Sequence, residues 1–306
     1  MNKIVKLIVL LLVCLITIFY FTNKNNPLNT QNNFNIIILG LDPRNDTLEK
    51  TETTDTIIFA SFNLKRAELN LISLPRDLWN YATNSKINQI YPDNIDDFDQ
   101  IQSEFARITG QTIHRTIIIT TQNLIDLVDL IGGVDVYLEQ GFKDEKYPNP
   151  DYIKNPSPKI SPYKTVEFPS GWIHLDKTNV AEFVRSRHAD SDLARIQRQQ
   201  LLIEAIFKKM TQPQYLSKLN YFYRHNLKTN LNYNDIVNLI LNLKFKILNP
   251  TSQAGLKLNK IDLPIGSKAG EGVIYYPNKL TRNQWAFLPS DPDYQALKEF
   301  IDKAIK

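Results

Sequence analysis

Cysteine is almost absent from this 306-residue chain, because Cys14 is the only one. No disulfide can form within the chain, and thiolate catalysis and cysteine-ligated zinc sites are excluded from everything after residue 14. Histidine is scarce too, and the four histidines show no spacing typical of a metal site. The sequence also lacks the GxSxG elbow of serine hydrolases and the GxxxxGK[ST] loop of nucleotide-binding proteins.

A strong charge of one sign is also lacking. The formal net charge is +4, and Lys3 and Lys6 account for two of these charges, which leaves 4 − 2 = +2 for the remainder. That balance is too weak to indicate a nucleic acid partner. Hydrophobic residues make up 42% of the chain, which indicates a packed core rather than disorder.

The N-terminus carries the one long hydrophobic run. Ile4 to Phe21 spans 18 residues that are apolar except for Lys6 and Thr17. As a helix at about 1.5 Å per residue this run is about 27 Å long, enough to cross a hydrocarbon core. Lys3 and Lys6 flank its N-terminal side, so the positive-inside rule places Met1 in the cytoplasm.

We therefore predict a single-pass type II protein of the cell membrane, with the bulk of the chain extracytoplasmic. Its predicted parts are a cytoplasmic tip and transmembrane anchor (1–23), a polar tether (24–33) and one extracytoplasmic domain (34–306). The alternative is a cleaved signal peptide. Against it, residues 20–26 contain no small-x-small cleavage site, and the apolar run is longer than a usual signal core.

Strand and helix patterns intermingle after residue 34, with no linker and no repeat. This predicts an α/β fold, a single-domain α/β/α sandwich with a central mixed sheet, preceded by the transmembrane helix. A segment rich in Pro, Lys, Tyr and Asp reads as a surface loop (143–165). The expected strands are 34–39, 56–62, 68–74, 116–121, 134–138, 257–264 and 272–276, and the expected helices are 96–109, 122–131, 176–184, 191–211, 233–247 and 291–305.

Polar residues gather at the ends of these elements. Asp42 and Arg44 follow the first strand, and Asp55 immediately precedes the second. Each aspartate alone is typical of an ordinary turn. Two carboxylates held close together would instead suit a Mg²⁺ that also touches phosphate oxygens.

Arginines dominate the other two groups. Arg76 and Asp77 follow the third strand, with Lys86 in the next loop. Further along, Arg195 and Gln199 are four residues apart and share one helix face. Arg185 and Arg187 leave the same side of the chain if that stretch is extended. A planar guanidinium grips phosphate oxygens with two parallel hydrogen bonds, although a solvated helix with ordinary ion pairs is the plainer reading.

Together these segments resemble the LytR–CpsA–Psr family of bacterial envelope proteins, from about Asn35 to the C-terminus. Seven features carry the resemblance in the same order, and the combination is far more specific than any one of them. They are "NIIILGLDPR" (35–44), "TDTIIFASFN" (54–63), "LISLPRDLW" (71–79), "KIN" (86–88), "LVDLIGGVDVYL" (127–138), "VAEFVRSRHADSDLARIQRQQ" (180–200) and the short N-terminal anchor.

The resemblance implies an extracytoplasmic phosphotransferase. Such enzymes take a glycopolymer (teichoic acid, capsular polysaccharide or another glycan) from an undecaprenyl-pyrophosphate carrier in the membrane lipid and attach it to peptidoglycan through a phosphodiester. They do so with Mg²⁺ and with an apolar tunnel for the prenyl tail. By motif position, the implied metal ligands are Asp42 and Asp55. The implied catalytic residues are Asp55, Arg76, Arg185 and Arg187. The implied pyrophosphate contacts are Arg76, Arg185, Arg187, Arg195 and Gln199, joined by Arg44 and Lys86.

Two features depart from the family pattern. Members often carry an arginine two residues before the second aspartate, where this chain has Thr53, and Arg44 or Lys50 would have to substitute. Leu41 and Pro43 flank the first aspartate, where members commonly have a small polar residue before it. Two other functions use the same residues: a tethered sensor of lipid intermediates, of the transcriptional attenuator type, and a pyrophosphatase with water as acceptor.

Overall fold

The computed structural model describes residues 33–41, 53–63, 65–66, 68–186, 192–210, 212–232, 235 and 257–306. The predicted anchor lies outside these residues, as does the predicted helix 233–247 apart from Asp235. None of the helices in these ranges is long and apolar enough to cross a lipid bilayer.

A six-stranded sheet forms the centre of the domain, in the order β11-β6-β1-β2-β3-β12. The neighbouring pairs β1–β2, β2–β3 and β6–β11 are antiparallel, whereas β1–β6 and β3–β12 are parallel, so the sheet is mixed as predicted. Its strands are β1 (Asn33–Leu41), β2 (Thr54–Asn63), β3 (Glu68–Ser73), β6 (Arg115–Thr120), β11 (Lys228–Thr229) and β12 (Lys257–Ile261).

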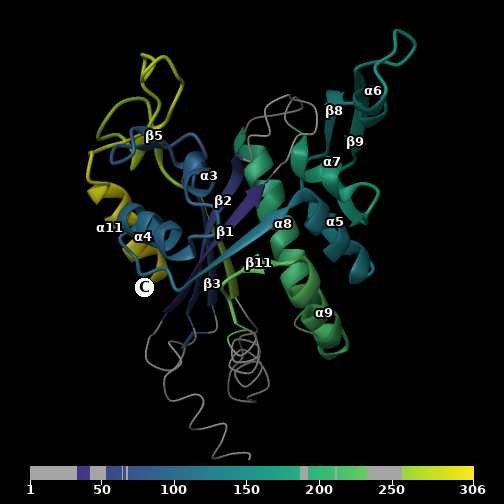
Figure 1. Cartoon of the computed structure of the whole chain (residues 1–306), viewed down its shortest axis with the longest axis horizontal. Coiled ribbons are helices and arrows are strands. Elements are labelled where there is room, and N and C mark those ends of the chain that lie inside the picture. The colour runs from purple at the N-terminus through teal and green to yellow at the C-terminus, as the bar shows by residue number, and fades with distance from the viewer. Residues whose placement is uncertain are drawn as a thin grey trace, which may run out of the picture.

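Helices cover both faces of the sheet, which gives three layers (Figure 1). Because successive strand side chains point to opposite faces, β1 feeds two cores. Ile37 and Leu39 pack with α4 (Phe98–Thr109) and α11 (Gln295–Ile305). The residues on the other face meet α8 and α9: they are Phe34, Ile36, Ile58 and Leu71, covered by Ile203 and Phe207 of α8 (Asp192–Met210) and Tyr223 of α9 (Leu216–Asn226).

Sequence patterns predicted the central elements well where hydrophobic periodicity is strong. Helix α4 begins at an N-cap, Asp97, whose carboxylate accepts a hydrogen bond from the Gln100 amide at 2.9 Å, and it ends at Gly110 in the left-handed conformation. The predicted helix 176–184 is shorter, because α7 begins only at Val180 and ends at Arg185. Helix α9 was missed, since its sequence is largely polar and aromatic.

The predicted loop 143–165 is wrong. It forms a hairpin of β8 (Phe142–Pro148) and β9 (Tyr163–Phe168), joined through α6 (Pro150–Lys154). The run "KDEK" hides the strand, because its charges break the alternation expected of a half-buried strand. The hairpin is held instead by strand pairing and by buried residues such as Phe168, which joins a third core beside the central sheet.

This third core belongs to a group of elements that lies beside the central sheet. It includes α5 (Thr121–Leu130), α7, and a two-stranded sheet of β7 (Val134–Leu138) with β10 (Gly171–Leu175). The remaining short elements are β4 (Trp79–Asn80), β5 (Ser85–Lys86), η1 (Ile87–Gln89), α3 (Ile90–Asp93), η2 (Pro213–Tyr215), β13 (Ile265–Gly266), β14 (Ile274–Tyr275) and β15 (Leu288–Pro289).

His114 is the residue immediately before β6, and its side chain contacts the start of β1. Its Nδ1 accepts a hydrogen bond from the Asn35 amide at 3.0 Å, and its ring stacks on Phe34 with centroids 5.1 Å apart. An imidazole nitrogen accepts a hydrogen bond only when it carries no proton. Burial lowers the pKa of His114, and the adjacent Arg115 lowers it further, while Asp235 acts in the opposite direction. The folded state therefore holds this histidine neutral.

We expect the domain to lose stability in mild acid through His114. The unfolded chain binds a proton near the ordinary histidine pKa of about 6.5, and the folded chain resists it, so the free energy of unfolding falls as the pH drops below that value. One proton limits this contribution to about 1.4 kcal/mol per pH unit. Urea unfolding at pH 7.5 and 5.5 measures it in wild type and in His114→Asn, with exposed His225→Asn as the control. Equal pH dependence in wild type and His114→Asn would contradict it.

Candidate functional site

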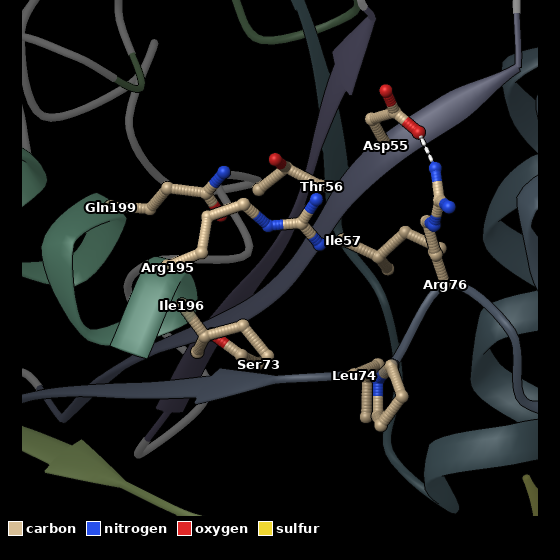
Figure 2. Close-up of a pocket in the computed structure, with 10 residues that line it drawn as sticks. Asp55, Thr56, Ile57, Ser73, Leu74, Arg76, Arg195, Ile196 and Gln199 are labelled. Carbon is tan, nitrogen blue, oxygen red and sulfur yellow. Dashed lines mark hydrogen bonds and ion pairs between the residues drawn. The ribbon is translucent and has the colours of Figure 1, made fainter. Parts of the chain in front are cut away.

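A small pocket opens at the end of the sheet where β2 begins and β3 ends (Figure 2). Strand β2 contributes Asp55 from within the strand rather than before it, which corrects the expected strand start at residue 56. The full lining consists of Asp55, Thr56, Ile57, Ser73, Leu74, Pro75, Arg76, Arg195, Ile196 and Gln199.

Arg76 is held by two carboxylates. Its Nη1 forms an ion pair with Asp55 Oδ1, and its Nε lies 3.4 Å from Asp77 Oδ2. Asp77 in turn accepts a hydrogen bond from Lys86 Nζ at 2.7 Å. These contacts fix a guanidinium whose side chain is still 27% exposed, so it is both oriented and accessible. Lys86 is thus bound to Asp77 and does not line the pocket.

Pro75 turns the chain after β3, and this turn brings Arg76 to the pocket. The last ladder bond runs from the Leu74 amide to Ile57 O at 2.9 Å, and the Leu78 amide then bonds Pro75 O at 2.9 Å. Proline has no amide hydrogen to continue the strand, and its carbonyl closes the turn whose central residues are Arg76 and Asp77.

Helix α8 supplies the opposite wall. Arg195 is only 4% exposed, and Figure 2 shows its guanidinium reaching toward β2 from the side opposite Arg76. Gln199 follows one turn later and also lines the pocket, in agreement with the predicted shared face. Two arginines from distant parts of the chain therefore line the same pocket as Asp55.

Arg198 has a different task from its neighbours. It is 3% exposed, donates to Phe183 O at 3.1 Å and to Ser186 O at 2.6 Å, and lies over the Phe142 ring at 4.2 Å. The last carbonyls of a helix have no partner within the helix, and these bonds satisfy them at the end of α7.

Gln199 adds a third bond to the same end. Its Nε2 donates to Val184 O at 3.4 Å. Since Arg185 is the last residue of α7, helix α8 fixes the backbone that carries it. Arg185 does not line the pocket formed by the described residues, and Asp42, Arg44 and Arg187 lie outside those residues.

Sequence reasoning missed a buried polar contact between the sheet and α8. Gln200 is 1% exposed, and its Nε2 donates to Ser73 Oγ of the pocket wall at 3.1 Å. The available signal was weak: Gln200 lies at the end of an arginine and glutamine run that looked solvent-exposed. The contact joins the end of β3 to α8 and so holds the two pocket walls together.

Electrostatically the pocket suits an anion. It presents the guanidinium groups of Arg76 and Arg195 against the single carboxylate of Asp55. Among the described residues no cluster of three or more acidic, histidine or cysteine side chains gathers as a metal site would require. A Mg²⁺ that keeps waters and substrate phosphates as ligands needs only one or two carboxylates, and this lining contains one, that of Asp55 (Figure 2).

The family model for the LytR_cpsA_psr family matches residues 20–285, most of the chain. The chain belongs to the LytR_cpsA_psr family. All the described residues that line the pocket fall within the matched range. The resemblance inferred from the seven sequence features is confirmed.

Curated relatives within the LytR_cpsA_psr family are named polyisoprenyl-teichoic acid–peptidoglycan teichoic acid transferase TagU. The protein from Bacillus cereus is 26% identical over 251 residues, which cover 79% of this chain and 72% of the relative. The protein from Enterococcus faecalis is 24% identical over 234 residues, covering 71% and 68%.

Solved structures share the fold. Bacillus subtilis TagV superimposes with a TM-score of 0.63 at 17% identity, covering 90% of this chain and 98% of TagV. TagT bound to LIIa-WTA gives a TM-score of 0.61 at 19% identity, covering 90% and 91%. At these identities the likeness establishes the mixed α/β fold, which confirms the predicted central mixed sheet.

Proposed function

We propose that this protein is a phosphotransferase that moves a glycopolymer from a polyprenyl-pyrophosphate carrier to peptidoglycan through a phosphodiester. The observation that carries the proposal is that Arg76 and Arg195, from distant parts of the chain, line one pocket together with Asp55. Transferase activity is supported by the curated relatives, which are named for transfer of polyisoprenyl-linked teichoic acid to peptidoglycan. The proposal includes one catalytic domain over residues 34–306, tethered by 24–33 to a membrane anchor at 1–23.

The arginines act on charge. A pyrophosphate repels an incoming hydroxyl oxygen, and Arg76 and Arg195 neutralise its non-bridging oxygens from opposite sides. The acceptor oxygen forms a bond to the phosphorus that carries the glycopolymer, the P–O bond to the second phosphate breaks, and polyprenyl monophosphate leaves. Asp55 is engaged by Arg76 and is a poor base in that state, so we assign the hydroxyl proton to solvent at the pocket mouth.

Mg²⁺ belongs to the proposal. Asp55 would hold it, with Asp42 as the second carboxylate from the family motif and substrate phosphate oxygens completing the shell. When bound, the ion neutralises phosphate charge alongside the arginines. Arg185 at the end of α7 and Arg187 just after it would complete the anion site, and Arg44 would contact the outer phosphate oxygens. Lys86 would act on the site through Asp77, to which it donates a hydrogen bond at 2.7 Å.

The pocket has no room for the lipid. About 250 Å³ of empty space lies within it, and that figure includes the open solvent at its mouth, so a polyprenyl tail does not fit. The predicted apolar tunnel therefore remains a prediction, and it requires the layers beside the pocket to separate when the lipid binds.

Reconstitution tests the activity. Full-length protein in detergent is incubated with a polyprenyl-pyrophosphate-linked glycopolymer, peptidoglycan fragments and Mg²⁺, and the phosphodiester product is measured by mass spectrometry. We expect transfer. We also expect EDTA to reduce the transfer rate about ten-fold or more, because phosphate charge that no cation neutralises raises the activation barrier. A ten-fold lower rate corresponds to a barrier about 1.4 kcal/mol higher.

The same assay separates the other functions. Release of free glycopolymer phosphate without a peptidoglycan adduct would identify a pyrophosphatase. Donor binding with no product of either kind, over a range of Mg²⁺ concentrations, would favour the sensor. Transfer that is insensitive to chelation would remove Mg²⁺ from the mechanism and leave the arginines as the sole source of charge neutralisation.

A further inference from the structure

Two aromatic side chains stand exposed and stacked in the segment between β12 and α11. The rings of Tyr276 and Trp285 have centroids 6.0 Å apart and planes inclined by 29°. They are 46% and 54% exposed, and Leu280, between them in the chain, is 48% exposed. A folded domain gains by burying large apolar rings, so a grouped and exposed set marks a binding surface. We call Tyr276 and Trp285 the aromatic platform.

The aromatic platform is joined to the candidate site by backbone contacts. Tyr276 packs edge-on against Phe287, with centroids 4.7 Å apart and an interplanar angle of 88°. The Phe287 amide donates to Asp77 O at 2.9 Å, and its carbonyl accepts from the Trp79 amide at 2.8 Å. Asp77 is the residue that holds Arg76.

The segment that carries the platform also stands beside β5 and α3, which follow Arg76 in the chain (Figure 1, yellow-green). The platform is therefore a fixed extension of the loop that bears Arg76.

A tight turn immediately precedes Trp285. The backbone amides of Thr281 and Gln284 each donate to the other's carbonyl at 2.9 Å, and Arg282 and Asn283 occupy the turn with φ of 47° and 62°. The side chains of Asn283 and Gln284 are exposed, as is that of Asn278. The segment 276–285 therefore presents both aromatic rings and side-chain amides to solvent, the two kinds of group that contact a sugar residue.

We propose that the aromatic platform binds the glycan strand of the acceptor, an inference that rests on the proposed transferase function. One face of a pyranose ring is lined with C–H groups of positive partial charge, which pack on the negative face of an aromatic ring. Hydroxyl and acetamido groups at the ring edge then pair with the amides of Asn278, Asn283 and Gln284. Occupancy of the platform brings an acceptor hydroxyl toward Arg76.

The surface fits the acceptor better than the donor. A phosphate-rich donor glycopolymer calls for several cations, and residues 276–285 contain only Lys279 and Arg282. A glycan strand instead offers consecutive sugar rings. A second exposed aromatic pair, Tyr137 and Trp172, lies on the β7–β10 sheet with an interplanar angle of 64°, and it supplies the control residue for the binding test.

Binding without donor tests the proposal. The probe is tetra-N-acetylchitotetraose, added to the full chain in detergent, with co-sedimentation on insoluble peptidoglycan as a second readout. Replacing Trp172 by Phe leaves Trp285 as the exposed reporter, because Trp79 is 3% exposed. We expect the probe to change Trp285 fluorescence, and Trp285→Ala to raise the Kd by calorimetry about ten-fold or more, which equals about 1.4 kcal/mol. Tyr276→Leu should weaken binding too, while Trp285→Tyr keeps a ring and retains most of it.

Trp172→Ala is the matched control, an exposed tryptophan away from the platform, and it should bind like wild type. Wild-type affinity in folded Trp285→Ala and Tyr276→Leu would overturn the proposal, as would equal loss in Trp172→Ala. If Trp285→Ala melts early, Trp285→Tyr and Tyr276→Leu decide in its place. A platform-dependent Kd with no transfer in the reconstituted assay would overturn the transferase proposal alone. Normal transfer with an unchanged KM for peptidoglycan in Trp285→Ala would overturn the platform alone.

Discussion

Arg76→Ala is expected to lower the transfer rate by about 100- to 1,000-fold, the usual effect of removing one preorganised donor to a developing oxyanion. The guanidinium is oriented by Asp55 and Asp77 before substrate arrives, so no reorganisation is needed as charge builds. Arg76→Lys keeps the charge but loses the two-pronged geometry, and it should also be impaired. The measurement is steady-state transfer of the glycopolymer to peptidoglycan fragments.

The fold should survive these substitutions. The Arg76 side chain is 27% exposed and lies at the pocket mouth, so the free energy of unfolding should fall by no more than about 1–2 kcal/mol. Arg224→Ala, on the exposed side of α9, is the matched control and should transfer at the wild-type rate. Near-normal turnover in a folded Arg76→Ala protein would remove Arg76 from the mechanism. Loss of activity together with unfolding would make its role structural.

Arg198→Met is expected to lower both stability and turnover. Methionine can still pack on Phe142, but it cannot donate to Phe183 O and Ser186 O, which are satisfied by Arg198 at 3.1 and 2.6 Å. Hydrogen bonds from a charged group contribute about 1.5–3 kcal/mol each, and relief from burying a charge offsets part of that. We therefore expect a loss of about 2–4 kcal/mol in the free energy of unfolding, measured in urea.

The effect on turnover separates positioning from packing. With α7 loosened, Arg185 loses its fixed backbone, so kcat should fall at a temperature where the variant is fully folded. Arg198→Lys retains a charged donor and should recover part of kcat. Gln197→Met, on the exposed face of the same helix, is the control and should match wild type. Wild-type kcat and stability in Arg198→Met would contradict the role of Arg198 in holding the end of α7 to α8.

Local sequence patterns were sufficient for the sheet centre and for several functional segments. β1, β2 and β3 are rich in apolar residues because they are buried on both faces, and such runs can be recognised in the sequence. Helix α4 was equally plain, since its apolar period and its Asp97 and Gly110 caps agree. The seven features identified the family because each is defined by residue types and their order along the chain. Both can be read without knowledge of the fold.

Tertiary structure decided what lies beside what. Sequence spacing could not show that Asp55 pairs with Arg76, 21 residues away, because that depends on the register of β2 against β3. It could not separate the roles of Arg195 and Arg198, since both are buried and only the packing of α8 shows that Arg195 lines the pocket while Arg198 bonds the end of α7. The β8–β9 hairpin was hidden for the same reason: charged residues conceal a strand whose stability comes from pairing and from the core beneath it. Residue patterns predict the local backbone conformation. Contacts between distant segments depend on how the whole domain packs to bury its apolar surface.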